Sequence, residues 1–181
     1  MTKCKYGNRD CVVKSGRCGC LCYTSCDFYY DTTGLPRLSL KDLTGRWFQL
    51  VRTPHPRQAV NSFNTSYKFT YKGGCLKAKG TTYIIRDGLF KKFTVFGKGV
   101  PLNNENNVLS LNFNDATTVQ PNFIIIYYDG DLLISTNNLK QSVEIIGRCK
   151  TLTLEQLSKL ITFLTERNYC TSDLIFTFQS C

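Results

Sequence analysis

A single tryptophan constrains the fold of this chain more than any other residue. Trp47 follows Gly45 and opens an alternating stretch that runs to Arg52, the pattern of a strand entered through a glycine turn. Much later in the chain, Arg148 ends the last segment with strand character. A guanidinium stacked on an indole contributes roughly 0.5–2 kcal/mol. We therefore expect a barrel whose first and last strands meet at a closed end, with Arg148 over the Trp47 ring.

The region between these two residues alternates and turns as a meander does. Asp87-Gly88 and Asp129-Gly130 are signals for tight hairpin turns, and Pro54 and Pro56 end the first strand because proline removes ladder donors. We predict strands at 46–53, 61–72, 75–86, 89–97, 108–113, 122–128, 131–136 and 141–149. Eight antiparallel strands joined in order favour an up-and-down barrel, which leaves no sheet edge and has an interior able to hold one small ligand.

The hydrophobic period changes after the last predicted strand. Apolar residues recur at helical spacing at Leu154, Leu157, Leu160, Ile161 and Leu164. Thr153 and Gln156 form the pattern of a capping box. The sequence therefore predicts an all-β fold with one C-terminal helix, at 154–167, packed on the outside of the barrel.

Cysteines divide the chain into two parts, a Cys-rich segment at 1–34 and a barrel region at 35–181. The ten cysteines are Cys4, Cys11, Cys18, Cys20, Cys22, Cys26, Cys75, Cys149, Cys170 and Cys181. A segment as small as 1–34 cannot build its own core, so we expect disulfides, whose pairing the sequence does not choose. Zinc bound by the four cysteines of 18–26 is the alternative, although the C-x-C spacing is unlike that of zinc knuckles.

This cysteine usage is typical of an oxidising compartment, but the residues after Met1 lack the apolar stretch of a secretory signal. Two explanations stay open. Either a signal has been removed and the protein is secreted, or the protein is associated with the particle of a virus that makes disulfides in the cytoplasm.

Charge and motifs narrow the function classes. The formal charge of +10 favours an acidic protein partner or an anionic membrane surface, with solubility as the plainer explanation, and no nucleic-acid-binding motif is present. His55 is the only histidine, and Asp129 and Asp131 fit a turn better than a catalytic pair. Since no phosphate loop or activated nucleophile appears, we expect a protein that is not an enzyme and uses neither metal nor cofactor.

Over about residues 40–180 the sequence resembles the lipocalin family, and most closely its bacterial outer-membrane lipocalin and apolipoprotein D branch. The first family motif corresponds to Gly45 and Trp47, and the third to Arg148. The second corresponds loosely to Tyr128-Asp129-Gly130-Asp131 and is degenerate. The segment Thr165-Glu166-Arg167-Asn168-Tyr169, followed by an apolar stretch, also fits that branch.

The resemblance implies that the barrel binds and carries a small hydrophobic ligand, such as a fatty acid or lysophospholipid. Alternation along strands then gives the expected lining, with Phe69 rather than Tyr67 facing inward. The candidate ligand-binding residues are Gln49, Val51, Phe69, Tyr83, Ile85, Phe93, Val95, Leu109, Leu111, Ile124 and Ile126. A barrel filled by its own aromatic side chains is the rival interpretation. In that case the protein is a structural or interaction module, for example a minor capsid or virion component of a large DNA virus.

The resemblance also implies a disulfide. In some lipocalins a cysteine near the second and third strands is tied to the C-terminal segment, which here implies Cys75 with Cys170 or Cys181. Cys149 is then left to hold the N-terminal segment. The Cys-rich residues 1–34 have no counterpart in the simple family pattern.

Overall fold

The structure is a computed structural model that describes residues 3–6, 9–12, 32–55, 58–114 and 119–180. Near the N-terminus, β1 (Lys3–Tyr6) and β2 (Arg9–Val12) form an antiparallel hairpin in which Cys4 is opposite Cys11. The cysteines at 18, 20, 22, 26 and 181 lie outside the described residues. The disulfide framework expected for 1–34 therefore stays a prediction.

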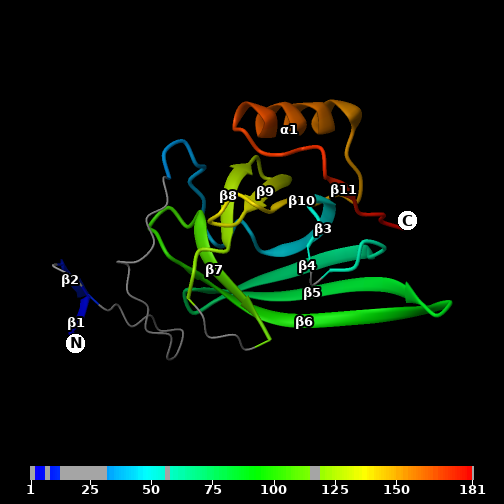
Figure 1. Cartoon of the computed structure of the whole chain (residues 1–181). Coiled ribbons are helices and arrows are strands. Elements are labelled where there is room, and N and C mark those ends of the chain that lie inside the picture. The colour runs from blue at the N-terminus through cyan, green and yellow to red at the C-terminus, as the bar shows by residue number, and fades with distance from the viewer. Residues whose placement is uncertain (1–2, 7–8, 13–31, 56–57, 115–118, 181) are drawn as a thin grey trace.

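Eight strands form a closed antiparallel barrel (Figure 1). Each strand pairs with the next in sequence, and β10 pairs with β3 to close the sheet, as the sequence predicts. The predicted and observed bounds differ by a few residues at most. The strands are β3 (Gly45–Arg52), β4 (Phe63–Lys72), β5 (Cys75–Arg86), β6 (Leu89–Pro101), β7 (Val108–Phe113), β8 (Phe123–Tyr128), β9 (Leu132–Thr136) and β10 (Val143–Gly147).

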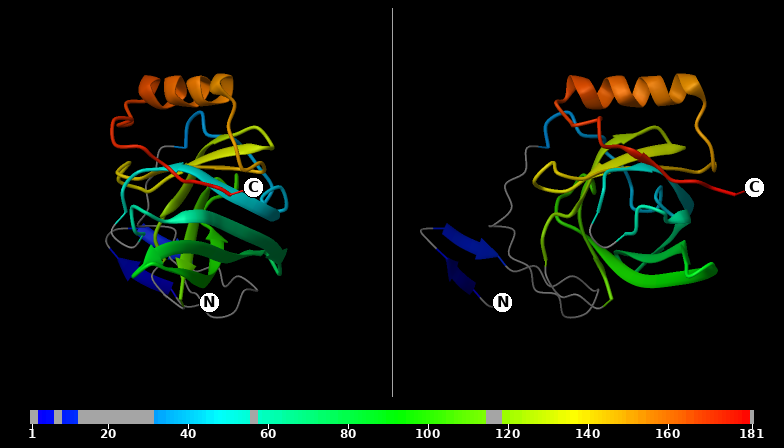
Figure 2. Two further views of the ribbon diagram at one scale, coloured as in Figure 1. Left: turned by 90° about the vertical axis from the view of Figure 1, so that its right-hand side faces the viewer. Right: turned by 45° about the vertical axis from the view of Figure 1, so that its right-hand side comes forward.

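Helix α1 (Leu154–Glu166) lies on the outside of the barrel, on the side away from β5 and β6 (Figure 2). Thr153 caps it, and the capping box with Gln156 is complete. Leu160 and Leu164 are buried against outward-facing residues of the barrel wall, among them Ile145. This outer core is separate from the cluster inside the barrel, which is built around Trp47 and Phe69.

The two motif residues meet at the closed end. The Arg148 guanidinium lies 3.7 Å from the centroid of the Trp47 ring, and the indole Nε1 donates to the Leu43 carbonyl at 2.8 Å. Arg148 also donates to the carbonyls of Asp42 (2.7 Å), Thr44 (2.8 Å) and Arg46 (3.2 Å). Gly45 has φ +103°, and a Cβ there would lie 2.9 Å from Arg148 Nη1, so glycine is required. The predicted contact is confirmed.

The C-terminal segment completes the wall between β3 and β4. These strands pair only from Gly45–Phe48 to Ser66–Phe69. Beyond that point β11 (Ile175–Phe176) pairs with β3, and the Thr177 amide donates to the Leu50 carbonyl at 2.9 Å. On its other side the Asn64 amide donates to the Phe178 carbonyl at 2.7 Å. Residues 175–180 thus fill the gap where β3 and β4 diverge.

The cysteines of the barrel region agree with the expectation only in part. Cys75 is disulfide-bonded, whereas Cys149 and Cys170 are free and exposed. Pairing of Cys75 with Cys170 and a clamp formed by Cys149 are therefore wrong, and pairing of Cys75 with Cys181, which lies outside the described residues, stays a prediction. The Cys170 thiol instead lies 3.2 Å from the Ser172 hydroxyl, a local contact within its own loop.

Candidate ligand-binding site in the barrel interior

The interior changes from apolar to polar along the strands. Next to the closed end it is packed with buried apolar side chains contributed by every strand of the barrel except β6. They are Trp47, Phe69, Leu76, Ala78, Leu109, Leu111, Phe123, Ile125, Leu133 and Ile146. On β3 the next inward residue beyond Trp47 is Gln49, where a polar cluster begins.

Glu144 is the centre of this cluster. Its Oε1 accepts hydrogen bonds from the Tyr67 hydroxyl at 2.6 Å and from Gln49 Nε2 at 2.5 Å. The three residues come from β10, β4 and β3, so the bonds connect distant parts of the sequence across the inside of the barrel. The Tyr67 ring stacks on Phe69, with centroids 6.0 Å apart and planes at 8°, which joins the polar cluster to the apolar floor.

The loop that follows β3 connects to the same cluster. Gln58 donates to Gln49 Oε1 at 2.7 Å, to the Ser62 hydroxyl at 3.0 Å and to the Thr65 hydroxyl at 3.2 Å. From the C-terminal segment, Thr177 donates to Gln49 Oε1 at 3.0 Å. Gln49 is therefore bonded to the wall and to the loop at once, and this network holds the loop at the open end.

Arg52 places a cation beside the cluster. A bulge at Leu50–Val51 breaks the alternation of β3, and this turns Arg52 inward. The side chain is only 2% exposed and donates to the carbonyls of Thr53 (3.2 Å) and Ala59 (2.8 Å). Its Nε is buried and has no acceptor among the described residues. A buried donor without a partner is the kind of group that a bound molecule or water satisfies.

Burial controls the protonation of these groups. Desolvation raises the pKa of Glu144, although the hydrogen bonds from Tyr67 and Gln49 and the charge of Arg52 act in the opposite direction. Desolvation and the Glu144 carboxyl together raise the pKa of Tyr67 well above its usual range. Desolvation lowers the pKa of Arg52, which Glu144 partly offsets. The cluster thus makes both the carboxyl and the phenol harder to ionise than they are in water.

Residues at the level of the cluster are less completely buried than those of the apolar floor. Tyr67 and Glu144 point into the barrel, and both residues are half-buried. The same is true of Val95, which faces Gly80 on the neighbouring strand. A Cβ on Gly80 would lie 3.0 Å from Val95 and 3.5 Å from the Tyr67 ring, so the absence of a side chain at Gly80 lets Val95 and Tyr67 pack here.

Several of the predicted lining residues do face inward. Gln49 belongs to the polar cluster, Phe69, Leu109 and Leu111 are buried in the inner core, and Val95 lies beside Tyr67 across Gly80. Phe93 is on the inward face of β6 but is 46% exposed, because β6 extends past its pairing with β7 there.

Five predicted lining residues do not face inward. Val51, Ile124 and Ile126 are in the outer core under α1, because the bulge displaces Val51 and because Phe123 and Ile125 are the inward residues of β8. Tyr83 and Ile85 lie on the outer face of β5, since the inward face there carries Thr82, which contacts Thr65 at 2.6 Å. Their predicted orientation is wrong.

Three residues of the site were not among the predicted lining, Tyr67, Glu144 and Arg52. Tyr67 lies two residues from Phe69 on a regular strand, so both face inward, contrary to the expectation. Glu144 was identifiable from the same alternation, as the one acidic residue within the predicted last strand. Arg52 had no such signal, because its direction depends on the bulge.

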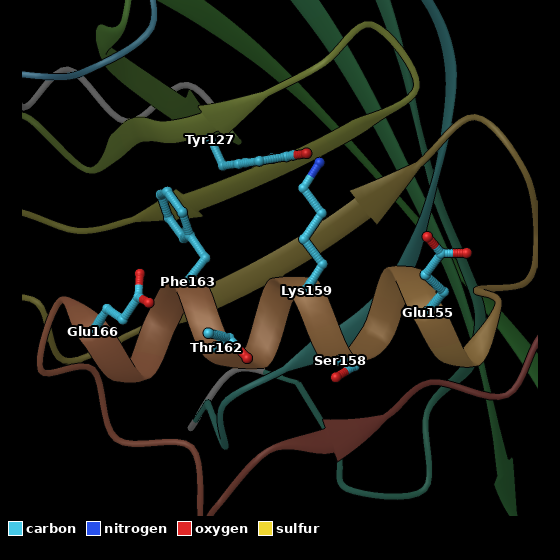
Figure 3. Close-up of a pocket in the computed structure, with 7 residues that line it drawn as sticks. All are labelled: Tyr127, Glu155, Ser158, Lys159, Thr162, Phe163 and Glu166. Carbon is cyan, nitrogen blue, oxygen red and sulfur yellow. The ribbon is translucent and has the colours of Figure 1, made fainter.

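A hollow lies on the outside of the barrel, between α1 and β8 (Figure 3). It is an open groove of about 560 Å³. Phe163 packs edge-on against Tyr127 at 5.2 Å, and a hydrogen bond with the Tyr127 hydroxyl raises the pKa of Lys159. Glu155 and Glu166 flank these residues in Figure 3. These contacts fasten the helix to the wall, and the groove is shallow and open to solvent.

Other kinds of site are not seen in the described part of the chain. Within it, no group of histidine, cysteine and carboxylate side chains is placed to hold a metal ion. None of the helices described is long and apolar enough to cross a membrane. His55 is exposed and forms an isolated bridge with Gln58 at the edge of the open end.

The barrel is similar to solved structures of arthropod proteins. Lobster apocrustacyanin A1 aligns over 77% of this chain and 79% of its own, with 19% identity and a TM-score of 0.60. H1 crustacyanin from the lobster Homarus americanus aligns over 85% of this chain and 94% of its own, with 19% identity and a TM-score of 0.58. The fold is that of the lipocalins. Insecticyanin from the tobacco hornworm Manduca sexta has the same fold. It aligns over 84% of this chain and 87% of its own, with 12% identity and a TM-score of 0.53. No family model and no curated protein sequence matches the chain.

Proposed function

We propose that this lipocalin-fold barrel binds and carries a small hydrophobic molecule, with the polar end of that molecule at the cluster of Gln49, Arg52, Tyr67 and Glu144. The observation that carries the proposal is a polar cluster with a buried, unpaired Arg52 Nε above an apolar floor inside a closed barrel.

This arrangement fits an amphiphile with one alkyl chain, such as a fatty acid or a lysophospholipid. Each CH₂ removed from water contributes about 0.8 kcal/mol, so a medium-length chain reaches roughly micromolar affinity after ordering costs. The unpaired Nε of Arg52 is a donor for an oxygen of the head group.

The first experiment asks whether any ligand is carried. The purified protein is extracted with organic solvent for mass spectrometry, and delipidated protein is titrated with the fluorescent fatty acid cis-parinaric acid. We expect an extracted lipid and saturable binding. Absence of both would overturn the proposal and favour the alternative, in which the barrel is a rigid structural or interaction module.

A matched pair of variants tests whether the ligand binds inside the barrel. Val95 faces inward and its neighbour Thr94 faces outward and is exposed. Val95→Trp puts a bulky ring inside the barrel and should weaken cis-parinaric acid binding about tenfold or more, whereas Thr94→Trp should leave it unchanged. Circular dichroism confirms that both variants are folded. Equal binding by the two variants would show that the ligand is not inside the barrel.

A further inference from the structure

The excess positive charge of the chain is concentrated in one stretch. Residues 43–104 contain eleven lysines and arginines and a single acidic residue, Asp87, a difference that equals the net charge of +10 of the whole chain. This stretch includes strands β3 to β6. One side of the barrel is therefore strongly basic, and the rest of the chain is neutral as a whole.

The β5–β6 hairpin carries this charge to its tip. The hairpin projects beyond the neighbouring strands at the right of Figure 1. Its turn is Asp87-Gly88, with φ of +56° and +72°. Arg86 precedes the turn, and Lys91 and Lys92 follow it, all three exposed. Three cations thus lie within a few residues of the turn, against one carboxylate.

Apolar side chains at the tip are exposed on both faces of the hairpin. Ile85 pairs with Phe90 and projects with it to the outer face, and they are 49% and 74% exposed. Leu89 and Phe93 project to the opposite face and are 64% and 46% exposed. Phe63 lies 5.9 Å from the Phe90 ring, and this is an edge contact at the base of the tip that leaves most of Phe90 uncovered.

We infer that this hairpin tip docks on a lipid bilayer that contains anionic lipids, with Ile85, Leu89 and Phe90 inserted at the boundary between head groups and acyl chains. Insertion requires an apolar medium that surrounds the tip, and a bilayer meets the apolar side chains of both faces at once. A folded protein partner would cover one face. Arg86, Lys91 and Lys92 then lie at the level of the anionic head groups, where each basic residue adds attraction.

Asp87 is the one group at the tip that opposes docking. Its carboxylate lies 3.8 Å from the Arg86 Nε, and both side chains are highly exposed. The ion pair offsets the negative charge, and the polar turn itself can stay within the head-group layer. Asp87→Asn should therefore strengthen docking, since it removes the repulsion from anionic lipids and leaves Arg86 free to contact phosphate.

The experiment is co-sedimentation of the full chain with vesicles of phosphatidylcholine, with and without phosphatidylserine. We expect binding only to the vesicles with phosphatidylserine, and weaker binding at high salt. Leu89→Ser/Phe90→Ser should lower the partition coefficient about tenfold or more. The control Leu154→Ser changes a leucine that is 86% exposed on α1, on the other side of the barrel, and should bind as the native protein does.

Charge is tested in the same way. Lys91→Glu/Lys92→Glu should abolish co-sedimentation. Lys68→Glu/Lys72→Glu makes the same change in net charge on β4, far from the tip, and should reduce co-sedimentation less. Phe90→Trp gives an independent readout, because the native Trp47 is fully buried and a tryptophan at 90 should shift its emission to the blue when vesicles are added. No shift, or equal binding by the tip variants and Leu154→Ser, overturns the inference.

One other outcome has a separate meaning. Capture of a protein by the hairpin without binding to vesicles would mean that the tip is a protein interface, which also overturns docking on lipid.

The inference goes beyond the proposed ligand binding and does not depend on it. Val95→Trp should lose cis-parinaric acid and keep vesicle binding, and Leu89→Ser/Phe90→Ser should show the reverse.

Discussion

At the scale of single residues, the central feature is a carboxyl placed where water is scarce. Glu144 accepts two hydrogen bonds inside the barrel and has Arg52 near it, yet desolvation outweighs these effects and raises its pKa. A carboxyl whose pKa is higher in the folded protein than in the unfolded chain binds its proton more tightly when folded. Unfolding then releases a proton over the intervening pH range.

The sign of the pH dependence follows from linkage. The contribution of Glu144 to stability is fully present below the ordinary pKa of 4.5 and is lost as the pH rises through the higher folded value. Glu144→Gln keeps an oxygen that accepts from Tyr67 and removes the titration. We expect the free energy of unfolding of the native protein to fall across this range and the variant to show a flatter profile. Urea unfolding at a series of pH values measures both.

Glu166→Gln is a suitable control, because Glu166 is exposed on α1, outside the barrel. Its profile should match that of the native protein. If Glu144→Gln also matched the native profile, the pH dependence would have to come from other groups, and the raised pKa of Glu144 would be contradicted.

At the scale of elements, the C-terminal segment acts as a seam in the barrel wall. Gln179 connects the two strands that it separates, because its Nε2 donates to the Gln49 carbonyl at 2.7 Å and to the Thr65 carbonyl at 2.9 Å. Neither carbonyl is on the segment itself. The side chain therefore replaces part of the ladder that β3 and β4 would form if they stayed paired.

Gln179→Ala should lower the free energy of unfolding by about 1–2 kcal/mol, because two carbonyls lose a donor in a partly buried position. Phe178→Ala is the matched control, since its side chain is 69% exposed and the backbone bond to Asn64 is unaffected. That change should stay within about 0.5 kcal/mol. Chemical denaturation of the two variants measures the difference, and an equal loss would contradict a specific role for the amide.

The same scale shows how far the sequence predicts the structure. Strand existence and order follow from turn residues and alternation, which are local, and they were predicted closely. The direction of individual side chains was predicted less well, because a bulge at Leu50–Val51 reverses the alternation of β3 and places Arg52 inside. A bulge depends on the pairing of β3 with β10, which is far away in the sequence. The polar cluster combines residues from several strands and is for that reason hard to predict.

At the scale of the whole molecule, closure depends on the stacking of Arg148 on Trp47. One guanidinium stacks on the indole face and donates to three carbonyls at or just before the start of β3. Burial lowers the pKa of Arg148, but the nearby Tyr128 and Asp131 act against this. The planar group satisfies several acceptors at once, and this fixes the first strand against the last.

Arg148→Lys should lower the free energy of unfolding by about 1–3 kcal/mol, because an ammonium cannot stack in the same way or serve all of these carbonyls. Arg167→Lys is the control. Arg167 also lies over a ring, 3.8 Å from the Phe163 centroid, but it is exposed on the outside. Its loss should stay within about 0.5 kcal/mol. Thermal and urea unfolding compare the two, and similar losses would mean that closure does not depend on Arg148.

The seam formed by residues 175–180 also sets an order of events during synthesis. The ribosome makes these residues after every strand of the barrel, so β3 and β4 emerge with a slit between them that nothing in the nascent chain can yet fill. Folding chaperones would meet this slit as a row of unpaired backbone groups. The barrel wall is closed between β3 and β4 only once the segment has left the exit tunnel and paired with both strands.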